Sequence, residues 1–387
     1  MIGERKETML LIRSGNVWLG PGQSRVGWDI LCENGKIREI GPGLKADGAQ
    51  VIDAAGRDVY PGVVLGLCAV GAVAFSEMGA WDMNEAANPV CPQMNIKDAF
   101  DLRELKLQRF GRAGVTSYGL CPGTNALLAG QMALAHVDGE RTADVFLAER
   151  IALKGNYTQS VKDAFKSKGA PQTRMAMYQL MDDAFRAAQE YMGKKEKDYD
   201  EGKEVLARAL RREIPFVVAA ETQGEIESVM EIGRKYDLRL VITGAYGVAP
   251  AAKEIMERGW HVMLGDSSYM MAGIKGHIDH RDFVRLYREG MKLSLFCSGD
   301  QAYPPAYEQV WWTAAQMSAA GATGDELMDM LTIQPARALG VDHLVGSLEA
   351  GKQADIIICR GNPAVRFDNY IDQTIVAGRL FFAREGK

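Results

Sequence analysis

Short, continuously apolar runs recur along the middle of the chain, separated by stretches with helical periodicity. VVLGLCA (63–69) and VTSYGL (115–120) lack the alternation of a strand that faces water on one side. Continuous apolar strands separated by helices are typical of a parallel sheet that is buried on both faces. The expected strands are 63–69, 115–120, 132–137, 145–151, 216–221, 239–244, 261–265 and 293–298.

Eight such strands within residues 61–343 predict an α/β fold of the (β/α)₈ TIM-barrel type, for which about 250 residues are typical. The third strand, 132–137, is the weakest of the set. Little helix separates it from the fourth strand.

The two ends of the chain have a different character, with short strands such as MLLIRSGNVWL near the start and TIVAGRLFF near the finish. Chain termini tend to lie close together. We therefore predict that residues 1–60 and 344–387 form one small β-sandwich domain beside the barrel. Ile52 and Ile356 should then lie in the same domain although they are far apart in sequence.

Composition excludes some classes of protein. The chain has 387 residues and a formal net charge of −5, which argues against nucleic acid as a partner because phosphate binding needs a basic face. No apolar run approaches the roughly 20 residues of a membrane span. The start of the sequence, MIGERKETML, lacks the apolar core of a signal peptide. We expect a cytoplasmic protein with no membrane partner.

Two segments carry a family resemblance. VIDAAGRDVYPGVV resembles the segment that leads into the barrel in the amidohydrolase superfamily, and LTIQPARALGVDHLVGSLEAGKQADIIICRGNP resembles the segment that leaves it. Between them, NEAANPVCP and CPGTNALLAGQMA are similar to segments of the imidazolonepropionase-like branch. The resemblance implies a metal centre at the C-terminal mouth of the barrel, where a bound divalent ion acidifies water.

The usual metal ligands of that superfamily are a His-x-His on the first strand, a carboxylated Lys or Glu on the fourth, a His on the fifth and on the sixth, and an Asp on the eighth. Carried over one at a time, these positions fall on Leu67 and Ala69, Arg150, Ala219 (with Glu221 two residues on), Gly244, and Ser298 (with Asp300 two residues on).

None of these positions carries the usual ligand. Leu and Ala offer no lone pair, and the guanidinium of Arg150 cannot be carboxylated as a lysine can. We therefore expect neither a bound metal nor another cofactor. We further hypothesise that Arg150 occupies the vacated metal site and forms a salt bridge with Glu221.

His277 and His280 form the one close histidine pair of the chain. An HxxH sequence with an adjacent Asp would suit a replacement metal site. The polar segment GIKGHIDHRDF is more typical of a loop that runs into a solvated helix start, and short motifs have high false-positive rates.

Three cysteines, Cys68, Cys121 and Cys297, fall at or just beyond the ends of expected barrel strands. Active sites of barrel enzymes occupy that face. A nucleophilic thiol needs a base or a cation beside it, and no histidine is placed to serve. We interpret these cysteines as inert buried thiols.

Two functions therefore compete. In the first, the protein is a metal-free pseudoenzyme, a scaffold or regulatory subunit in a homo- or hetero-oligomer, with a catalytically active amidohydrolase paralogue as the candidate partner. The 19 methionines and the adjacent Trp311 and Trp312 favour such an interface. In the second, it is an atypical, metal-independent hydrolase of C–N bonds other than peptide bonds, acting through Arg150, Glu221, Asp300 or a cysteine.

Overall fold

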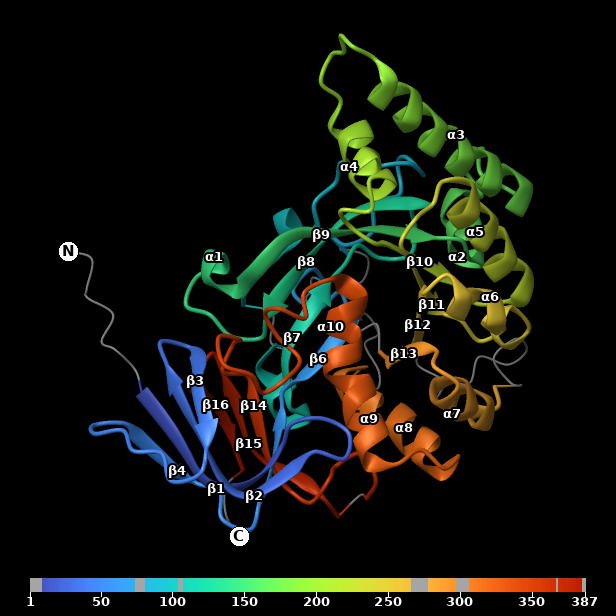
Figure 1. Cartoon of the computed structure of the whole chain (residues 1–387). Helices are drawn as coiled ribbons and strands as arrows, with labels where there is room; N and C mark the ends of the chain where they lie inside the picture. The colour runs from blue at the N-terminus through green and yellow to red at the C-terminus, as the bar shows by residue number, and fades with distance from the viewer. Residues whose placement is uncertain are drawn as a thin grey trace, which may run out of the picture.

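Two eight-stranded sheets organise the chain (Figure 1). The computed structural model describes residues 9–73, 81–103, 107–265, 278–296, 306–366 and 368–384. One sheet is built from both ends of the chain, and the other is the barrel. No helix among the described residues is long and apolar enough to cross a membrane.

The first sheet joins the N-terminal and C-terminal strands in the order β16-β15-β14-β5-β1-β2-β3, with β4 added to β1. The two ends meet where β14 runs antiparallel to β5, with Ile356 opposite Pro61. Ile52 and Ile356 lie in this one sheet and in the same buried cluster, as predicted. The strands are β1 (Met9–Trp18), β2 (Ser24–Glu33), β3 (Lys36–Gly41), β4 (Gln50–Asp53), β5 (Asp58–Pro61), β14 (Ile356–Arg360), β15 (Tyr370–Val376) and β16 (Arg379–Ala383).

The second sheet runs in sequence order from β6 to β13, and these two strands also contact each other, so the barrel is nearly closed. This confirms the predicted fold class. The strands are β6 (Val63–Cys68), β7 (Val115–Leu120), β8 (Leu128–His136), β9 (Phe146–Asn156), β10 (Phe216–Ala220), β11 (Leu240–Gly244), β12 (His261–Leu264) and β13 (Lys292–Leu295).

One strand departs from the expected parallel arrangement. β8 is antiparallel to both of its neighbours, β7 and β9. A parallel connection needs a crossover of a dozen or more residues, whereas antiparallel strands can be joined by a short loop. Residues 121–127 between β7 and β8 are too few for a crossover, so the chain turns back on itself.

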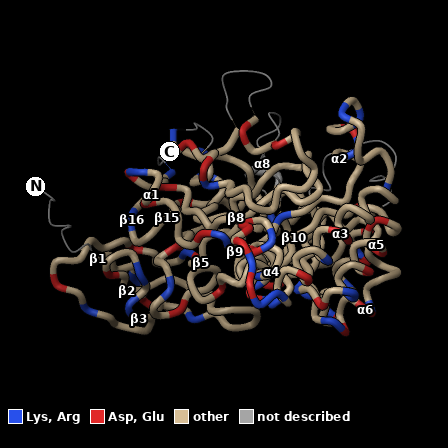
Figure 2. The backbone as a smooth tube through the Cα atoms, turned by 90° about the horizontal axis from the view of Figure 1, so that it is seen from above, with Lys and Arg blue, Asp and Glu red and all other residues tan. Residues whose placement is uncertain are grey.

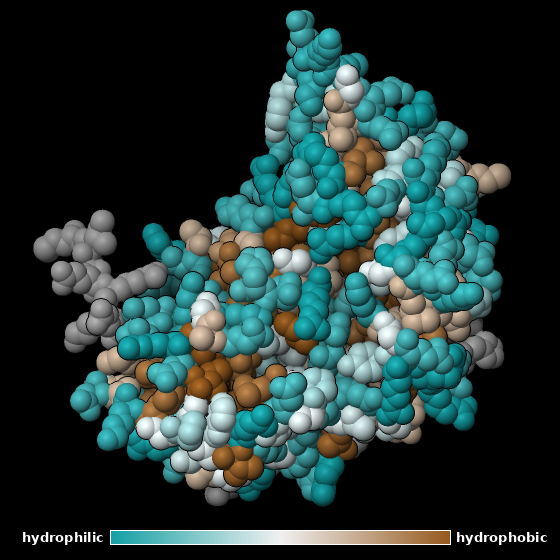
Figure 3. Space-filling view, viewed as in Figure 1, coloured by the Kyte–Doolittle hydropathy of each residue, from teal (hydrophilic) through white to brown (hydrophobic). Residues whose placement is uncertain are grey.

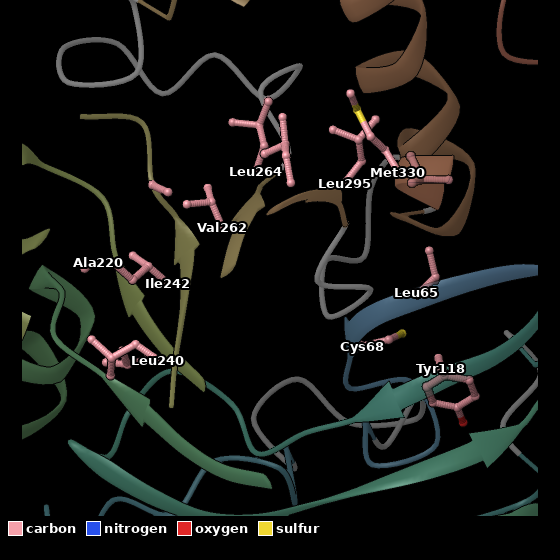
Figure 4. Packing of buried hydrophobic residues seen from close by; sticks show 14 of the residues in the cluster. Leu65, Cys68, Tyr118, Ala220, Leu240, Ile242, Val262, Leu264, Leu295 and Met330 are labelled. Atoms are coloured by element: carbon pink, nitrogen blue, oxygen red, sulfur yellow. The ribbon is translucent and has the colours of Figure 1, made fainter. Parts of the chain in front are cut away.

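Helices cover the outside of the barrel and pack on the outward-facing side chains of its strands. Phe185 of α3 lies edge-on to Phe216 of β10, with ring centroids 5.5 Å apart. Met330 of α9 lies beside Leu295 of β13 (Figure 4). The α-helices are α1 (Thr142–Val145), α2 (Gln159–Phe165), α3 (Arg174–Gly193), α4 (Glu201–Leu210), α5 (Gln223–Lys235), α6 (Ala252–Glu257), α7 (His280–Arg288), α8 (Ala306–Ala319), α9 (Gly324–Leu331) and α10 (Ile333–Leu339), and the 3₁₀ helices are η1 (Ile96–Ala99), η2 (Leu107–Ala113) and η3 (Ala249–Ala251).

The inside of the barrel is a second, separate apolar cluster. Successive side chains of a strand point to opposite faces, so residues two apart share a face. α10 contributes to the same cluster, and the interior is therefore filled with side chains. Members of this interior cluster include Val64, Leu67, Met132, Leu134, Ala152, Val217, Val241, Met263 and Leu339.

The molecular surface mixes charges of both signs. Lys and Arg are interspersed with Asp and Glu along the backbone seen in Figure 2. On the face seen in Figure 3, hydrophilic residues cover most of the outer helices, and hydrophobic residues show over the end-derived sheet and between elements.

The chain passes from the first sheet into the barrel through a single residue. Gly62 separates the end of β5 from the start of β6, and its N–H donates to the carbonyl of Asp355 over 2.9 Å. A Cβ at this glycine would overlap the Thr116 side chain. The Asp355 carboxylate in turn contacts His136 Nε2 at 3.0 Å and accepts from the Ala377 N–H at 3.0 Å.

Gly62→Ala should lower the free energy of unfolding by about 1–3 kcal/mol, because the added methyl group overpacks the junction against Thr116. Gly41→Ala is the matched control, since a Cβ there meets no atom within 4 Å. Urea denaturation of both variants measures the difference. Equal midpoints for Gly62→Ala and Gly41→Ala would refute the proposed tightness of the junction.

A buried histidine at the start of β12 gives the fold an acid sensitivity. His261 is 4% exposed, and its Nε2 lies 3.2 Å from Ser294 Oγ. Burial, reinforced by the positive charges of Lys292, Arg239 and Arg337, lowers the pKa of His261 from 6.5 to about 3. Between these pH values the unfolded chain binds a proton that the folded chain does not, so stability falls as pH falls.

His261→Gln should therefore flatten the pH dependence of unfolding between pH 6.5 and about 3. In the parent protein the protonation of His261 on unfolding contributes up to about 1.4 kcal/mol of lost stability per pH unit in this window. Denaturation midpoints at pH 7 and pH 5 measure the effect. If the two proteins lose stability in parallel on acidification, His261 is not the responsible group.

Candidate functional site

The C-terminal ends of the barrel strands form the mouth that the family resemblance designates as the site. Leu67 of β6 is 3% exposed and belongs to the interior cluster, whereas Ala69, which follows the end of β6, belongs to the outer cluster. The pairing of β6 with β7 shifts register between Leu65 and Cys68. The two positions therefore do not present a pair of side chains to one point, and both are apolar.

The next part of the mouth is built by β10 and β11. Ala219 pairs with Thr243, and the half-buried Glu221 follows the end of β10. Gly244 has a φ of +82°, and a Cβ there would lie 3.1 Å from Glu221 Cγ. A histidine at position 244 would thus be strained in its backbone and crowded by Glu221. Glycine fits this position, and a metal-binding imidazole does not.

A tyrosine and a phenylalanine extend this side of the mouth. The ring of Tyr246 lies 3.8 Å from the Cβ position of Gly244, which places it beside Glu221. The Tyr246 hydroxyl and the Phe296 ring lie 2.8 Å and 3.3 Å from the Cβ position of Gly265. Carboxylate, phenol and aromatic surface therefore line the described part of this rim.

Arg150 does not occupy the mouth, and the hypothesis that it pairs with Glu221 is wrong. Its guanidinium forms a salt bridge with Glu201 of α4 at 2.8 Å, and its side chain is 48% exposed. The residue has a φ of +54° at an irregularity in the pairing of β8 with β9. This bulge turns Arg150 outward, because a left-handed residue breaks the alternation of the strand.

The fourth barrel strand continues beyond Arg150 and places a buried lysine inside the barrel. Lys154 pairs with Val217, a member of the interior cluster, and shares a face with Ala152. Lys154 is 3% exposed, and its Nζ donates to the Gly155 carbonyl at 2.8 Å and to Asn156 Oδ1.

Asn156 connects this lysine to the loop between β7 and β8. Its Nδ2 donates to the carbonyls of Gly123 and Ala126 at 3.0 and 2.8 Å, and its side chain is fully buried. The fourth strand thus does carry a lysine on its inner face, contrary to the assignment of that position to Arg150. The sequence indicated this extension of the strand only by LKGN (153–156), and its polar residues are more typical of a loop.

The structure describes some of the remaining candidate site residues, and the others lie outside the described residues. His280 is the first residue of α7, whose N-cap Asp279 accepts from the Arg281 N–H, so the helix-start interpretation holds there. Cys68 and Cys121 are buried in the outer and interior clusters. Ser298, Asp300, Cys297 and His277 lie outside the described residues.

The described residues do not fit the family's metal centre. Within that part of the chain, no three His, Cys, Asp or Glu side chains come together in a way that could hold an ion. The strand ends instead offer the apolar Leu67 and Ala219, the crowded Gly244, and one lysine. A single lysine without imidazole partners does not make a divalent site.

The fold is a nearly closed eight-stranded barrel with a flanking sheet built from both ends of the chain. The sequence profile of the Amidohydrolase family matches residues 120–381, more than half of the chain. The chain therefore belongs to the Amidohydrolase family. No curated protein matches the sequence.

Solved structures share the architecture. An amidohydrolase from Thermotoga maritima MSB8 has a TM-score of 0.89 at 24% identity, over 97% of this chain and 100% of that one. A putative prolidase from Bifidobacterium longum has a TM-score of 0.64 at 14% identity, over 96% and 94%. Molinate hydrolase has a TM-score of 0.60 at 13% identity, over 97% and 94%. At these identities the likeness shows the fold alone.

Substitutions in the Lys154–Asn156 pair test whether each side chain contributes to the stability of the fold. Asn156→Ala should lower the free energy of unfolding by about 1–3 kcal/mol, because it leaves buried carbonyls without donors. Lys154→Met should cost less, because the variant no longer has to bury an ammonium group. Chemical denaturation orders the two variants. A larger loss for Lys154→Met would mean that the lysine serves stability.

Proposed function

We propose that this protein is an Amidohydrolase-family member that does not use the metal-hydroxide mechanism and acts as a non-catalytic scaffold or regulatory subunit. The observation that carries the proposal is the apolar, well-packed Leu67 at the first-strand position where the family resemblance requires a histidine. Ala219 and the crowded Gly244 support it on the fifth and sixth strands.

The proposed setting is a cytoplasmic oligomer. Among the described residues, the first, fifth and sixth strands carry Leu67, Ala219 and Gly244 where the family resemblance requires imidazoles, so we infer that the fold is retained for something other than metal chemistry. A catalytically active amidohydrolase paralogue is the candidate partner.

A specific observation favours a second candidate, metal-independent hydrolysis of a C–N bond other than a peptide bond. Lys154 is held inside the barrel by neutral oxygens, and Glu221 and Tyr246 lie on the rim. An amine, a carboxylate and a phenol are groups that move protons in enzymes. Arg150 is no longer a candidate, because it faces solvent on the outer side.

Metal content and activity separate the two candidates from a conventional amidohydrolase. Untagged protein exposed to Zn²⁺ and then desalted should contain far less than one equivalent of metal by elemental analysis, and a chelator should leave its unfolding midpoint unchanged. One tightly held equivalent, with a midpoint that falls on chelation, would overturn both candidates.

Activity then distinguishes the candidates from each other. If the protein is a scaffold, the parent protein should hydrolyse amide, urea or carbamate substrates no faster than the Lys154→Met variant does. A rate that is lost in Lys154→Met but kept in Lys166→Met, a control on the exposed end of α2, would establish the second candidate. Light scattering at micromolar concentration tests the assembly, and a monomer near 42.4 kDa would contradict it.

A further inference from the structure

A cavity of about 670 Å³ lies between the barrel and the end-derived sheet. Its walls come from η2, from α8, from the segment after β14, from β15 and from the residue that follows β16, and these parts are far apart in sequence. This volume is in the range of small-molecule sites, about 300–1,000 Å³. The arginine and aromatic side chains among its lining residues are Arg112, Trp311, Trp312, Arg366, Tyr370 and Arg384.

The cavity is positively charged although the protein is acidic overall. Three arginines line it, and no Asp or Glu is among its described lining residues, in a chain with 45 basic and 50 acidic residues. Arg366 forms a salt bridge with Asp368, which is not itself a lining residue. Within the described residues, neither Arg112 nor Arg384 is paired with a carboxylate. Their guanidinium groups are therefore available to an anion.

Aromatic rings supply the other part of the wall. The Trp311 indole is fixed in place, because its Nε1 donates to the Ala113 carbonyl at 2.9 Å. Trp312, one residue on, is 48% exposed. The Arg384 guanidinium lies 4.3 Å from the centroid of Tyr370, and its Nε donates to the Ile371 carbonyl at 3.3 Å. Backbone and ring contacts thus orient this arginine without neutralising it.

We propose that this cavity is a binding site for small anions that carry a flat aromatic ring, with the carboxylate or phosphate held by Arg112 and Arg384 and the ring against Trp312. The arginine fork suits both kinds of anion. An indole face suits a planar ring. Simple anions lack the ring, and neutral aromatics lack the charge, so the site selects compounds that have both.

The position of the cavity separates it from the barrel mouth. Ala113, which lines it, precedes the start of β7 at Val115, so the cavity lies towards the N-terminal ends of the barrel strands. Barrel chemistry occurs at the opposite face. The site is therefore independent of whether the mouth is catalytic, and its ligand bridges the barrel and the end-derived sheet.

Four probes test the proposal on the full chain: adenosine monophosphate, 2-naphthoate, adenosine and inorganic phosphate. Isothermal titration and the unfolding midpoint report binding, since a ligand of the folded state raises the midpoint. We expect adenosine monophosphate, 2-naphthoate or both to bind at least roughly tenfold more tightly than adenosine and phosphate. A preference for one of the first two identifies the anion as phosphate or carboxylate.

Variants locate the bound probe. Arg112→Ala should weaken binding by roughly tenfold. Arg384→Lys keeps the positive charge but removes the two-pronged guanidinium, and it should weaken binding by a similar factor. Arg186→Ala on the distant α3, with a 53% exposed side chain, is the control and should bind as the parent does. Trp312→Phe should reduce the fluorescence change that accompanies binding, with Trp311 of the same cavity left in place.

Three results would overturn the proposal. They are adenosine or phosphate binding as tightly as both adenosine monophosphate and 2-naphthoate, binding that survives both arginine substitutions, and no binding of any probe. In the last case, light scattering that shows a dimer dissociated by Trp312→Glu would reassign the surface to contact with a second copy of this chain.

Discussion

The tight crossing at Gly62 fixes how the two sheets of this protein are related. The chain passes from the last residue of β5 to the first of β6 through one residue that has no room for a side chain. Asp355, which leads into β14, accepts the Gly62 N–H with its carbonyl and binds His136 of the barrel with its carboxylate. One aspartate thereby ties both ends of the chain to the barrel.

The strands on either side of this crossing were predictable from sequence because their chemistry is uniform. VTSYGL matches β7 in full, and FVVAAE exceeds β10 by one residue. Both are buried on both faces, and continuous apolarity is the local signature of that environment. The direction of β8 was not predictable in this way, because strand direction depends on what connects the strands and not on their composition.

The residues at the barrel mouth were harder to predict than the strands of the barrel, and β9 shows why. The expected strand ends at Ile151 and the apolar residues at Leu153, but the strand runs on to Asn156, because the Lys154 ammonium donates to Asn156 inside the barrel. A polar pair that is buried by mutual hydrogen bonding looks like a loop in a single sequence. The bulge that turns Arg150 outward could not be predicted from the sequence either, since an arginine does not indicate a left-handed backbone.

Strand β7 links the mouth to the basic cavity at the other end of the barrel. η2, which lines the cavity, leads directly into β7, and the carbonyl of Gly111 in η2 accepts from Thr374 Oγ1 of β15 at 2.7 Å. β7 in turn continues into the loop whose carbonyls hold Asn156 at the mouth. A compound that tightened the contact of η2 with β15 would therefore act on the strand that positions the Lys154–Asn156 pair. Coupling of this kind needs two arrangements of η2 and β7 that differ in affinity for the compound, because a ligand shifts an equilibrium only by its differential affinity for the two states.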